Sequence, residues 1–154
     1  MAEPARTVPR LLFDRVARTP HAEAFRHPAG DDWSSVSWGE VGSRVTALAA
    51  GLIGRGIAPG AHVAVCAVTS YEWILADLAI VCAGAVTVPI YPATPPADVA
   101  ALLRHSGSVL TFTDRPLPTT PLLYLNRLGE LEDEGRRLLA ADPEAVAARI
   151  AGVT

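Results

Sequence analysis

The hydrophobic pattern between residues 38 and 114 switches between helical spacing and continuous apolar runs. After Ser37, apolar side chains recur about every 3.6 residues as far as Ile53, which predicts an amphipathic helix. Residues 62–68 (HVAVCAV) then form an unbroken apolar run, which is typical of a strand buried on both faces. We therefore expect an α/β domain with a parallel sheet.

The alternation continues toward the C-terminus. Helices are predicted from about residue 69 to 83 and from 94 to 105, and strands are predicted over 85–91 and 109–113. Because right-handed crossovers join consecutive parallel strands, the order β-α-β-α-β predicts a parallel sheet with helices on its faces.

Polar residues and glycines mark the ends of these helices. Ser37 followed by Glu40 predicts a capping box, and Thr69 followed by Glu72 predicts a second one. Three glycines spaced G-x-x-G-x-G do not match the dinucleotide-binding fingerprint and are interpreted as the end of the first helix. They are Gly51, Gly54 and Gly56.

Shorter elements flank the core and complete a single domain. They are a helix over 11–18, hairpin strands over 24–27 and 35–37, an edge strand over 122–125, and helices over 129–140 and 142–150. The expected organisation is a lead-in (1–37), a core (38–114) and a connector with terminal helices (115–154). The acidic run from Glu132 to Glu134 is interpreted as the solvated first turn of a helix.

Composition and charge restrict the possible functions. Half of the 154 residues are apolar, 19% are charged, and the formal net charge is −3, so nothing indicates nucleic-acid binding. All 13 basic residues are arginine. A phosphate loop of the G-x-x-x-x-G-K-[ST] type and any mechanism that needs an ammonium group are therefore excluded for this sequence.

Candidate catalytic and metal-binding residues are few. Cys66 and Cys82 lie in apolar runs and are expected to be buried, reduced thiols. No G-x-S-x-G motif is present, and the histidines show no metal-ligand spacing. The sequence predicts no catalytic residue and no metal site; its histidines are His21, His27, His62 and His105.

The apolar stretch over residues 73–91 is long enough to raise the question of a membrane span. Asp77 near its start and Pro89 near its end favour a helix that runs into a buried strand. The first ten residues contain no apolar stretch, so no secretory signal is predicted. A cytoplasmic location is the expectation.

The most suggestive segment follows the strand predicted over 85–91. Open α/β sheets bind ligands at the carboxyl ends of their strands, and a helix N-terminus comes directly afterwards. A plain structural loop remains the alternative, because every such sheet has several strand ends. The four candidate residues are Tyr91, Pro92, Ala93 and Thr94.

Residues 38–114 also contain segments that resemble a known family. The helix end LAAGL, the segment EWILADLA and the strand AGAVTVPIYP follow one another as in adenylate-forming acyl-CoA synthetases, with the long-chain fatty-acid–CoA ligases closest. GELEDEGRRLL resembles the segment that leads to the phosphate loop of this family. The resemblance extends over roughly residues 10 to 150, and no single motif carries it.

The resemblance implies part of the N-terminal subdomain of the adenylate-forming fold. The complete enzymes convert ATP and a fatty acid to an acyl-adenylate with Mg²⁺, and CoA then displaces AMP. Residues 91–94 match the loop that borders the CoA pantetheine channel in relatives. Arg115 lies near the position where some relatives place an arginine against the CoA phosphates.

The phosphate loop and lysines on which this chemistry depends do not occur in the sequence, which ends at Thr154 about where that loop is expected. The chain is therefore expected to be inactive alone and to hold no cofactor by itself. Its expected partner is the remainder of the synthetase or another polypeptide. The alternatives are a non-catalytic scaffold or binding module and a small self-contained nucleotide-binding domain.

Overall fold

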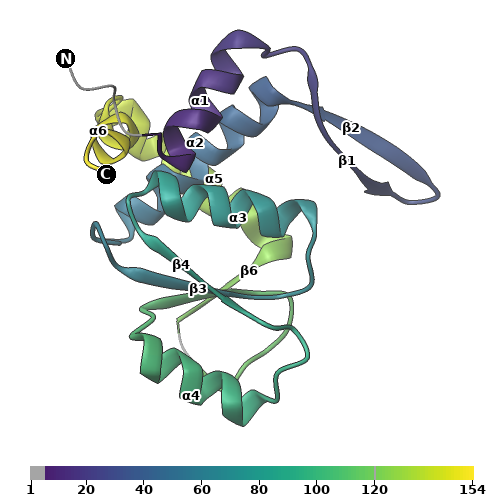
Figure 1. Cartoon of the computed structure of the whole chain (residues 1–154), viewed down its shortest axis with the longest axis vertical. Coiled ribbons are helices and arrows are strands. Elements are labelled where there is room, and N and C mark those ends of the chain that lie inside the picture. The colour runs from purple at the N-terminus through teal and green to yellow at the C-terminus, as the bar shows by residue number, and fades with distance from the viewer. Residues whose placement is uncertain (1–5, 120) are drawn as a thin grey trace.

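The structure, a computed structural model, describes residues 6–119 and 121–154. A four-stranded parallel sheet in the order β4-β3-β5-β6 forms its centre (Figure 1). The strands are β3 (His62–Cys66), β4 (Val86–Ile90), β5 (Leu110–Thr113) and β6 (Leu122–Tyr124). The predicted α/β fold with a parallel sheet is confirmed.

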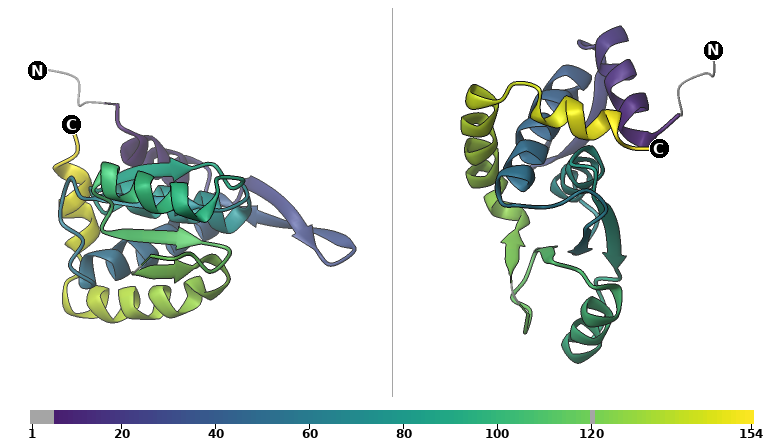
Figure 2. Two further views of the ribbon diagram at one scale, coloured as in Figure 1. Left: turned by 90° about the horizontal axis from the view of Figure 1, so that it is seen from below. Right: turned by 90° about the vertical axis from the view of Figure 1, so that its left-hand side faces the viewer.

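The helices cover the two faces of this sheet unequally (Figures 1 and 2). One face carries α2 (Trp38–Gly54), α3 (Tyr71–Cys82) and α5 (Leu128–Ala141), the last preceded by the short 3-10 helix η1 (Leu125–Arg127). Among the described elements, α4 (Pro96–Ser106) alone covers the other face. Strands β3 (after His62) and β5 are buried between these layers, as their apolar runs predict. The strand predicted to be buried over 85–91 is instead the edge strand β4, which is exposed at Val86 and Pro89.

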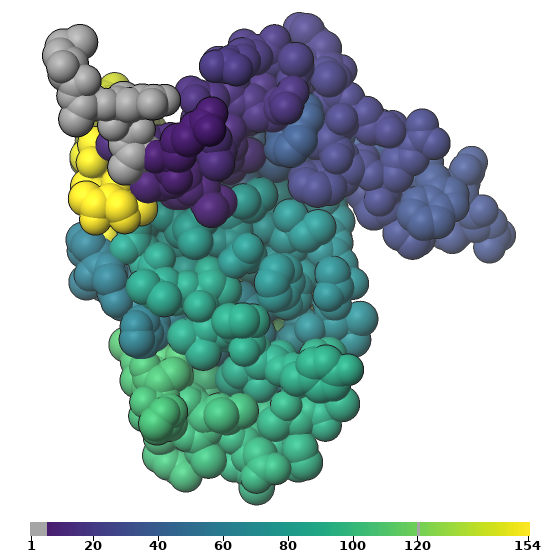
Figure 3. Space-filling view, in the orientation of Figure 1, coloured from purple at the N-terminus to yellow at the C-terminus, as the bar shows by residue number. Residues whose placement is uncertain are grey.

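Two helices and a two-stranded hairpin complete the described chain. Helix α1 (Val8–Arg18) packs on α2, and α6 (Ala145–Ala151) lies beside it at the C-terminal end. Strands β1 (Glu23–Ala29) and β2 (Asp32–Ser37) form an antiparallel hairpin that projects from the body of the molecule (Figure 3). The predicted hairpin is therefore confirmed, with longer strands than expected.

Strand β3 contributes side chains to the hydrophobic clusters on both faces of the sheet. Its side chains alternate, so that Val63 and Val65 join the large core beneath α2, α3 and α5. Ala64 and Cys66 join the smaller cluster beneath α4. All four are fully buried. A central strand with apolar residues on both faces is the reason why this segment shows no polar alternation.

Helices α2 and α5 approach each other through glycine. A Cβ atom on Gly135 would overlap the carbonyl of Ala47, and one on Gly51 would overlap the carbonyl of Leu131. Gly51 lies in the last turn of α2, as predicted, and its missing side chain also admits the neighbouring helix. Gly56, with a φ of +85°, does follow the end of α2 as predicted.

Two local predictions have different outcomes at the helix N-termini. The capping box of α2 is confirmed, because Ser37 Oγ accepts from the Glu40 amide and the Glu40 carboxylate accepts from the Ser37 amide. The second box is wrong. Ser70 caps α3 instead, accepting from the Trp73 amide at 3.1 Å, so the helix begins one residue later than the Thr69 motif requires.

The acidic run of α5 is not simply a solvated turn. Glu132 is only 4% exposed and accepts from Arg44 Nη2 at 2.6 Å and from Arg136 Nη2 at 3.2 Å. Arg44 comes from α2, so this carboxylate joins the two helices. The prediction of a solvated face is wrong for Glu132, while Asp133 is exposed.

Candidate functional site at the carboxyl edge of the sheet

The carboxyl ends of β3, β4 and β5 lie level with one another. Cys66, the last residue of β3, pairs in register with Ile90 of β4 on one side and with Thr113 of β5 on the other. The connecting helices α3 and α4 lie on opposite faces of the sheet. Such a reversal leaves a crevice beyond the strand ends, where open α/β sheets bind their ligands.

Arg115 links these three strand ends. Its Nη2 donates to the carbonyl oxygen of Pro92 at 2.5 Å and lies 3.6 Å from Cys66 Sγ. Its Nη1 lies 3.4 Å from Asp114 Oδ1. One guanidinium thus contacts the loop after β4, the end of β3 and the segment after β5. The side chain is engaged by protein groups rather than directed freely into solvent.

Two polar side chains brace the same loops. Asp114 Oδ2 accepts a hydrogen bond of 2.9 Å from the Val68 amide, which joins the segments after β5 and β3. The buried Thr113 hydroxyl donates to the Arg115 carbonyl at 2.7 Å and accepts from the Arg115 amide at 3.2 Å. These bonds satisfy the buried hydroxyl and fix the chain where it leaves the sheet.

Sequence reasoning assigns no role to Thr113 or Asp114. Asp114 accepts from the Val68 amide, which becomes its neighbour only when the parallel sheet forms, whereas Thr113 bonds to Arg115 two residues away. The one available signal was a charged pair, Asp114 and Arg115, directly after a buried apolar strand. In a parallel sheet that position is the ligand-binding edge.

The four candidate residues predicted from the sequence form the turn between β4 and α4. The Thr94 amide donates to the Tyr91 carbonyl at 3.0 Å, which closes the turn. Tyr91 is 76% exposed and Ala93 is also exposed, whereas Pro92 and Thr94 are half-buried. The structure therefore places all four at the carboxyl edge, and their contact with a ligand stays a prediction.

The two cysteines are not suited to nucleophilic chemistry. Both are buried, as predicted. Burial raises the pKa of the Cys66 thiol, although the nearby Arg115 opposes the shift, and burial raises the pKa of Cys82 to about 12. A thiol with a raised pKa carries little thiolate at neutral pH and is a poor nucleophile.

Metal ligands do not gather in the part of the chain that the structure describes. Within residues 6–119 and 121–154, no three histidine, cysteine, aspartate or glutamate side chains lie close enough to hold a metal ion. Among those same residues, no helix combines the length and the apolar character needed to cross a membrane. The apolar stretch over 73–91 instead forms α3 and β4.

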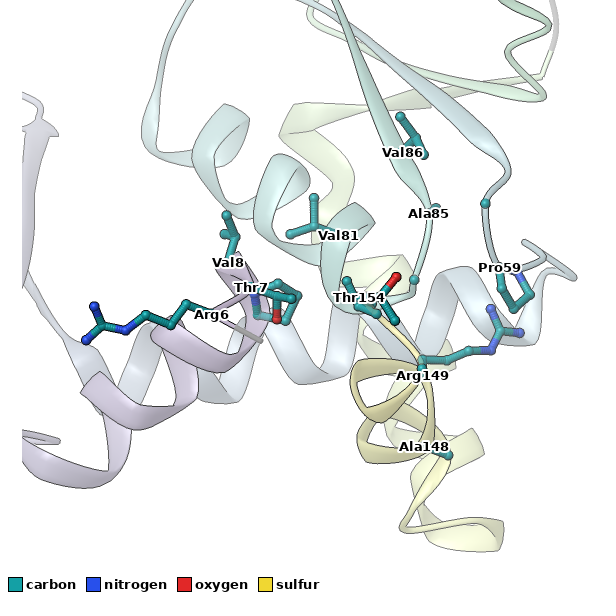
Figure 4. Close-up of a pocket in the computed structure, with 15 residues that line it drawn as sticks. Arg6, Thr7, Val8, Pro59, Val81, Ala85, Val86, Ala148, Arg149 and Thr154 are labelled. Carbon is teal, nitrogen blue, oxygen red and sulfur yellow. The ribbon is translucent and has the colours of Figure 1, made fainter. Parts of the chain in front are cut away.

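A separate hollow of about 640 Å³ lies at the opposite edge of the sheet, near the start of β4 (Figure 4). Its wall includes Pro59, Ala85 and Arg149. The Arg149 guanidinium donates to the carbonyl oxygens of Ile57 and Ala83, both at 2.9 Å. Ala83 is the C-cap of α3 and Ile57 lies in the segment after α2, so Arg149 holds α6 against the core.

Comparison with known proteins identifies relatives of this chain. The family model described as AMP-binding enzyme matches residues 12–150. The long-chain-fatty-acid–CoA ligase FadD15 of Mycobacterium bovis is 30% identical over 119 residues, which are 77% of this chain and 20% of that protein. Phosphinothricin tripeptide synthetase PhsB of Streptomyces viridochromogenes is 37% identical over 109 residues, which are 71% of this chain and 9% of that protein.

Solved structures share the fold. The N-terminal subdomain of Klebsiella oxytoca NpsA, in complex with 3-hydroxybenzoyl-AMSN, matches with a TM-score of 0.72 and 24% identity. The match covers 82% of this chain and 32% of that one. The chain spans a fifth or less of the length of the two curated relatives named above.

Proposed function

Because the chain belongs to the family of AMP-binding enzymes, we propose that it forms part of a fatty-acid–CoA ligase and contributes one wall of the CoA channel. The complete reaction joins ATP and a fatty acid into an acyl-adenylate with loss of pyrophosphate. The thiol of CoA then attacks the acyl carbonyl, and AMP leaves. The 30% identity to FadD15, over 77% of the chain, supports this class.

One observation favours the carboxyl edge as the contact for CoA. Arg115 donates a hydrogen bond to the Pro92 carbonyl in the turn of residues 91–94, and the side chain of Tyr91 is exposed to solvent. A tyrosine ring supplies apolar area and a polar tip, which suits a thin pantetheine arm. Tyr91, Pro92, Ala93 and Thr94 are therefore proposed to border that arm.

Arg115 is proposed to position the turn rather than to bind the CoA phosphates. Its guanidinium already contacts the Pro92 carbonyl, Cys66 Sγ and the Asp114 carboxylate. Binding a phosphate would require at least the carbonyl contact to break.

The proposed site is tested by titrating pantetheine into the chain while observing tryptophan and tyrosine fluorescence. Tyr91→Ala should weaken binding at least about fivefold, in line with the loss of one aromatic contact. Trp33→Ala is the matched control, because Trp33 is another largely exposed aromatic side chain, at 65%, on the distant hairpin. Equal weakening in both variants, or none in either, contradicts the proposal.

The chain alone is proposed not to form an acyl-adenylate. It contains no lysine, and no residue of this chain is assigned to ATP or Mg²⁺. Purified chain mixed with ATP, Mg²⁺ and a fatty acid should release no pyrophosphate above background. Fatty-acid-dependent release that survives repeated purification would refute this part of the proposal without affecting the pantetheine test.

A second candidate is an adenylation function in peptide synthesis. The 37% identity to PhsB over 71% of the chain favours it. If the coding sequence downstream of Thr154 continues with a Ser/Thr/Gly-rich loop and a lysine, the joined polypeptide can be assayed to separate the two candidates. Pyrophosphate release by the joined polypeptide with fatty acids supports the first candidate, and release with amino acids supports the second.

Association with another polypeptide is also proposed, whether as part of an enzyme or as a non-catalytic scaffold. Large apolar side chains lie exposed on separate elements, and the sheet ends at the edge strand β4, whose unpaired backbone groups favour continuation into a partner. If light scattering shows a strictly monomeric chain and its thermal unfolding is sharp and cooperative, a partner is not required for folding. The side chains are Leu11, Val68, Val86, Leu102 and Val109.

A further inference from the structure

A groove between α1 and α6 combines apolar and cationic walls. It encloses about 810 Å³, and it lies away from the carboxyl edge of the sheet. Figure 2 shows the two helices side by side near the chain ends. Arg10 Nη2, which reaches the Ala151 carbonyl at 3.5 Å, links the two walls.

The apolar part of the groove comes from both helices. Phe13 of α1 and Ile150 of α6 line it, with Val146 beneath at 3% exposure, and Leu11 is 50% exposed. Val146 and Ile150 are four residues apart and so share one face of α6. The groove is therefore a strip of apolar surface with a helical wall on each side.

The charge of the groove is opposite in sign to that of the whole chain. Four arginines and one aspartate line it, which gives 4 − 1 = +3, whereas the chain as a whole carries −3. None of the four arginines belongs to any of the seven ion pairs formed among the described residues. They are Arg6, Arg10, Arg15 and Arg18, and the aspartate is Asp14.

We propose that this groove binds an acidic amphipathic helix of a partner protein. Its apolar side chains would lie on Phe13 and Ile150, and its carboxylates would face Arg15 and Arg18 along α1. A helix with one apolar face and one acidic face matches a groove that combines apolar and cationic side chains, in the way that amphipathic helices generally dock. A flat anionic membrane would contact the rims and leave the apolar floor uncovered. This inference does not depend on CoA binding.

The test uses a synthetic, fluorescently labelled peptide of about 18 residues, roughly five helical turns. Leucines at helical spacing form one face and glutamates the other. Fluorescence anisotropy should show saturable binding to the chain, with affinity that falls as salt rises. A scrambled peptide of the same composition should bind at least about tenfold more weakly, because charge alone does not reproduce the apolar face.

Matched variants locate the binding. Arg15→Gln with Arg18→Gln should weaken peptide binding at least about tenfold, whereas Arg104→Gln with Arg137→Gln removes two exposed arginines elsewhere and should leave it unchanged. Arg15, Arg18 and Arg104 all lie in the last turns of their helices, where loss of the charge has a comparable effect, and Arg137 lies within α5. Circular dichroism confirms that each variant is folded.

The apolar contact has its own pair of variants. Leu11→Ser should weaken binding about fivefold or more, and Leu102→Ser, at a leucine of α4 with similar exposure (45%), should not. Equal binding of the scrambled peptide overturns the proposal. So does equal loss in the control variants, or binding to phosphatidylserine vesicles with no binding of the peptide.

Discussion

The two faces of the sheet are built differently, and the difference separates stability from function. On one side, α2, α3 and α5 bury most of the core, with helices in contact through Gly51 and Gly135 and joined by the buried Glu132. On the other side, α4 covers a much smaller cluster that includes Val99 and Leu103. The loops of the candidate site adjoin the lightly covered side, where a ligand or partner can approach without disturbing the main core.

The largest effect is expected where α2 and α5 touch. Gly135→Ala should destabilise the chain by about 3 kcal/mol or more, because the added methyl group meets the backbone of Ala47, which cannot rotate away. The free energy of unfolding from urea denaturation measures the effect. Gly129→Ala is the control in the same helix, where the added methyl group meets nothing within 4 Å, and a gain of up to about 1 kcal/mol is expected there. Similar losses in both variants would show that the two helices are not closely packed.

The buried carboxylate between these helices should come next. Glu132→Gln is expected to cost about 2 kcal/mol, because the half-buried Arg44 loses its charged partner. Glu130→Gln is the matched control, since Glu130 pairs with Arg127 at the surface, and its loss should be about 0.5 kcal/mol or less. Thermal melts of the two variants compare them directly, and equal shifts would contradict the joining role of Glu132.

At the carboxyl edge of the sheet, a substitution should change the local mobility of the backbone more than the free energy of unfolding. Arg115→Gln is expected to cost about 1 kcal/mol, because it removes contacts to Pro92 and Asp114 at the edge of the sheet. Hydrogen exchange should accelerate in the turn of residues 91–94 and remain slow in α2 and α5. The exposed Arg104 of α4 provides the control substitution to Gln. Unchanged exchange in the turn would remove Arg115 from its proposed positioning role.

The smallest expected effect is a loss of stability at acidic pH. Arg55 donates to Glu134 and holds the pKa of that carboxyl below its ordinary value of 4.5. The unfolded chain then binds more protons near that pH, so this stabilisation is present above about pH 4.5 and is lost as the pH falls further. Because the pair is more than a third exposed, the loss should be about 0.5 kcal/mol or less. Melting curves between about pH 6 and about pH 3 should show a weaker decline in stability for Glu134→Gln than for Glu144→Gln.

Local features of the sequence were predictable because their causes are local. Ser37 and Glu40 lie within one helical turn, and the apolar run of β3 reports burial on both faces directly. The cap of α3 was misplaced by one residue, since Thr69 and Ser70 are both competent caps and only the path of the chain after β3 selects Ser70.

Contacts between distant segments were not predictable in the same way. Arg44 and Glu132 are 88 residues apart, so nothing near Glu132 in the sequence distinguishes it from a solvated acid. Gly135 likewise occupies an ordinary helical position until α2 lies against it. For the candidate site, residues 91–94 were found from the strand before them, whereas the link from Arg115 to the Pro92 carbonyl needed the finished sheet.

The most direct measurement is an amide chemical-shift map of the isotope-labelled chain during titration with CoA. If the carboxyl edge binds CoA, the amides of Tyr91, Thr94 and Arg115 should shift progressively and saturate together, with those of α2 and α5 unchanged. Shifts confined to the opposite edge, around Gly84 and Arg149, or no shifts at all, would contradict the assignment of the ligand site to this edge.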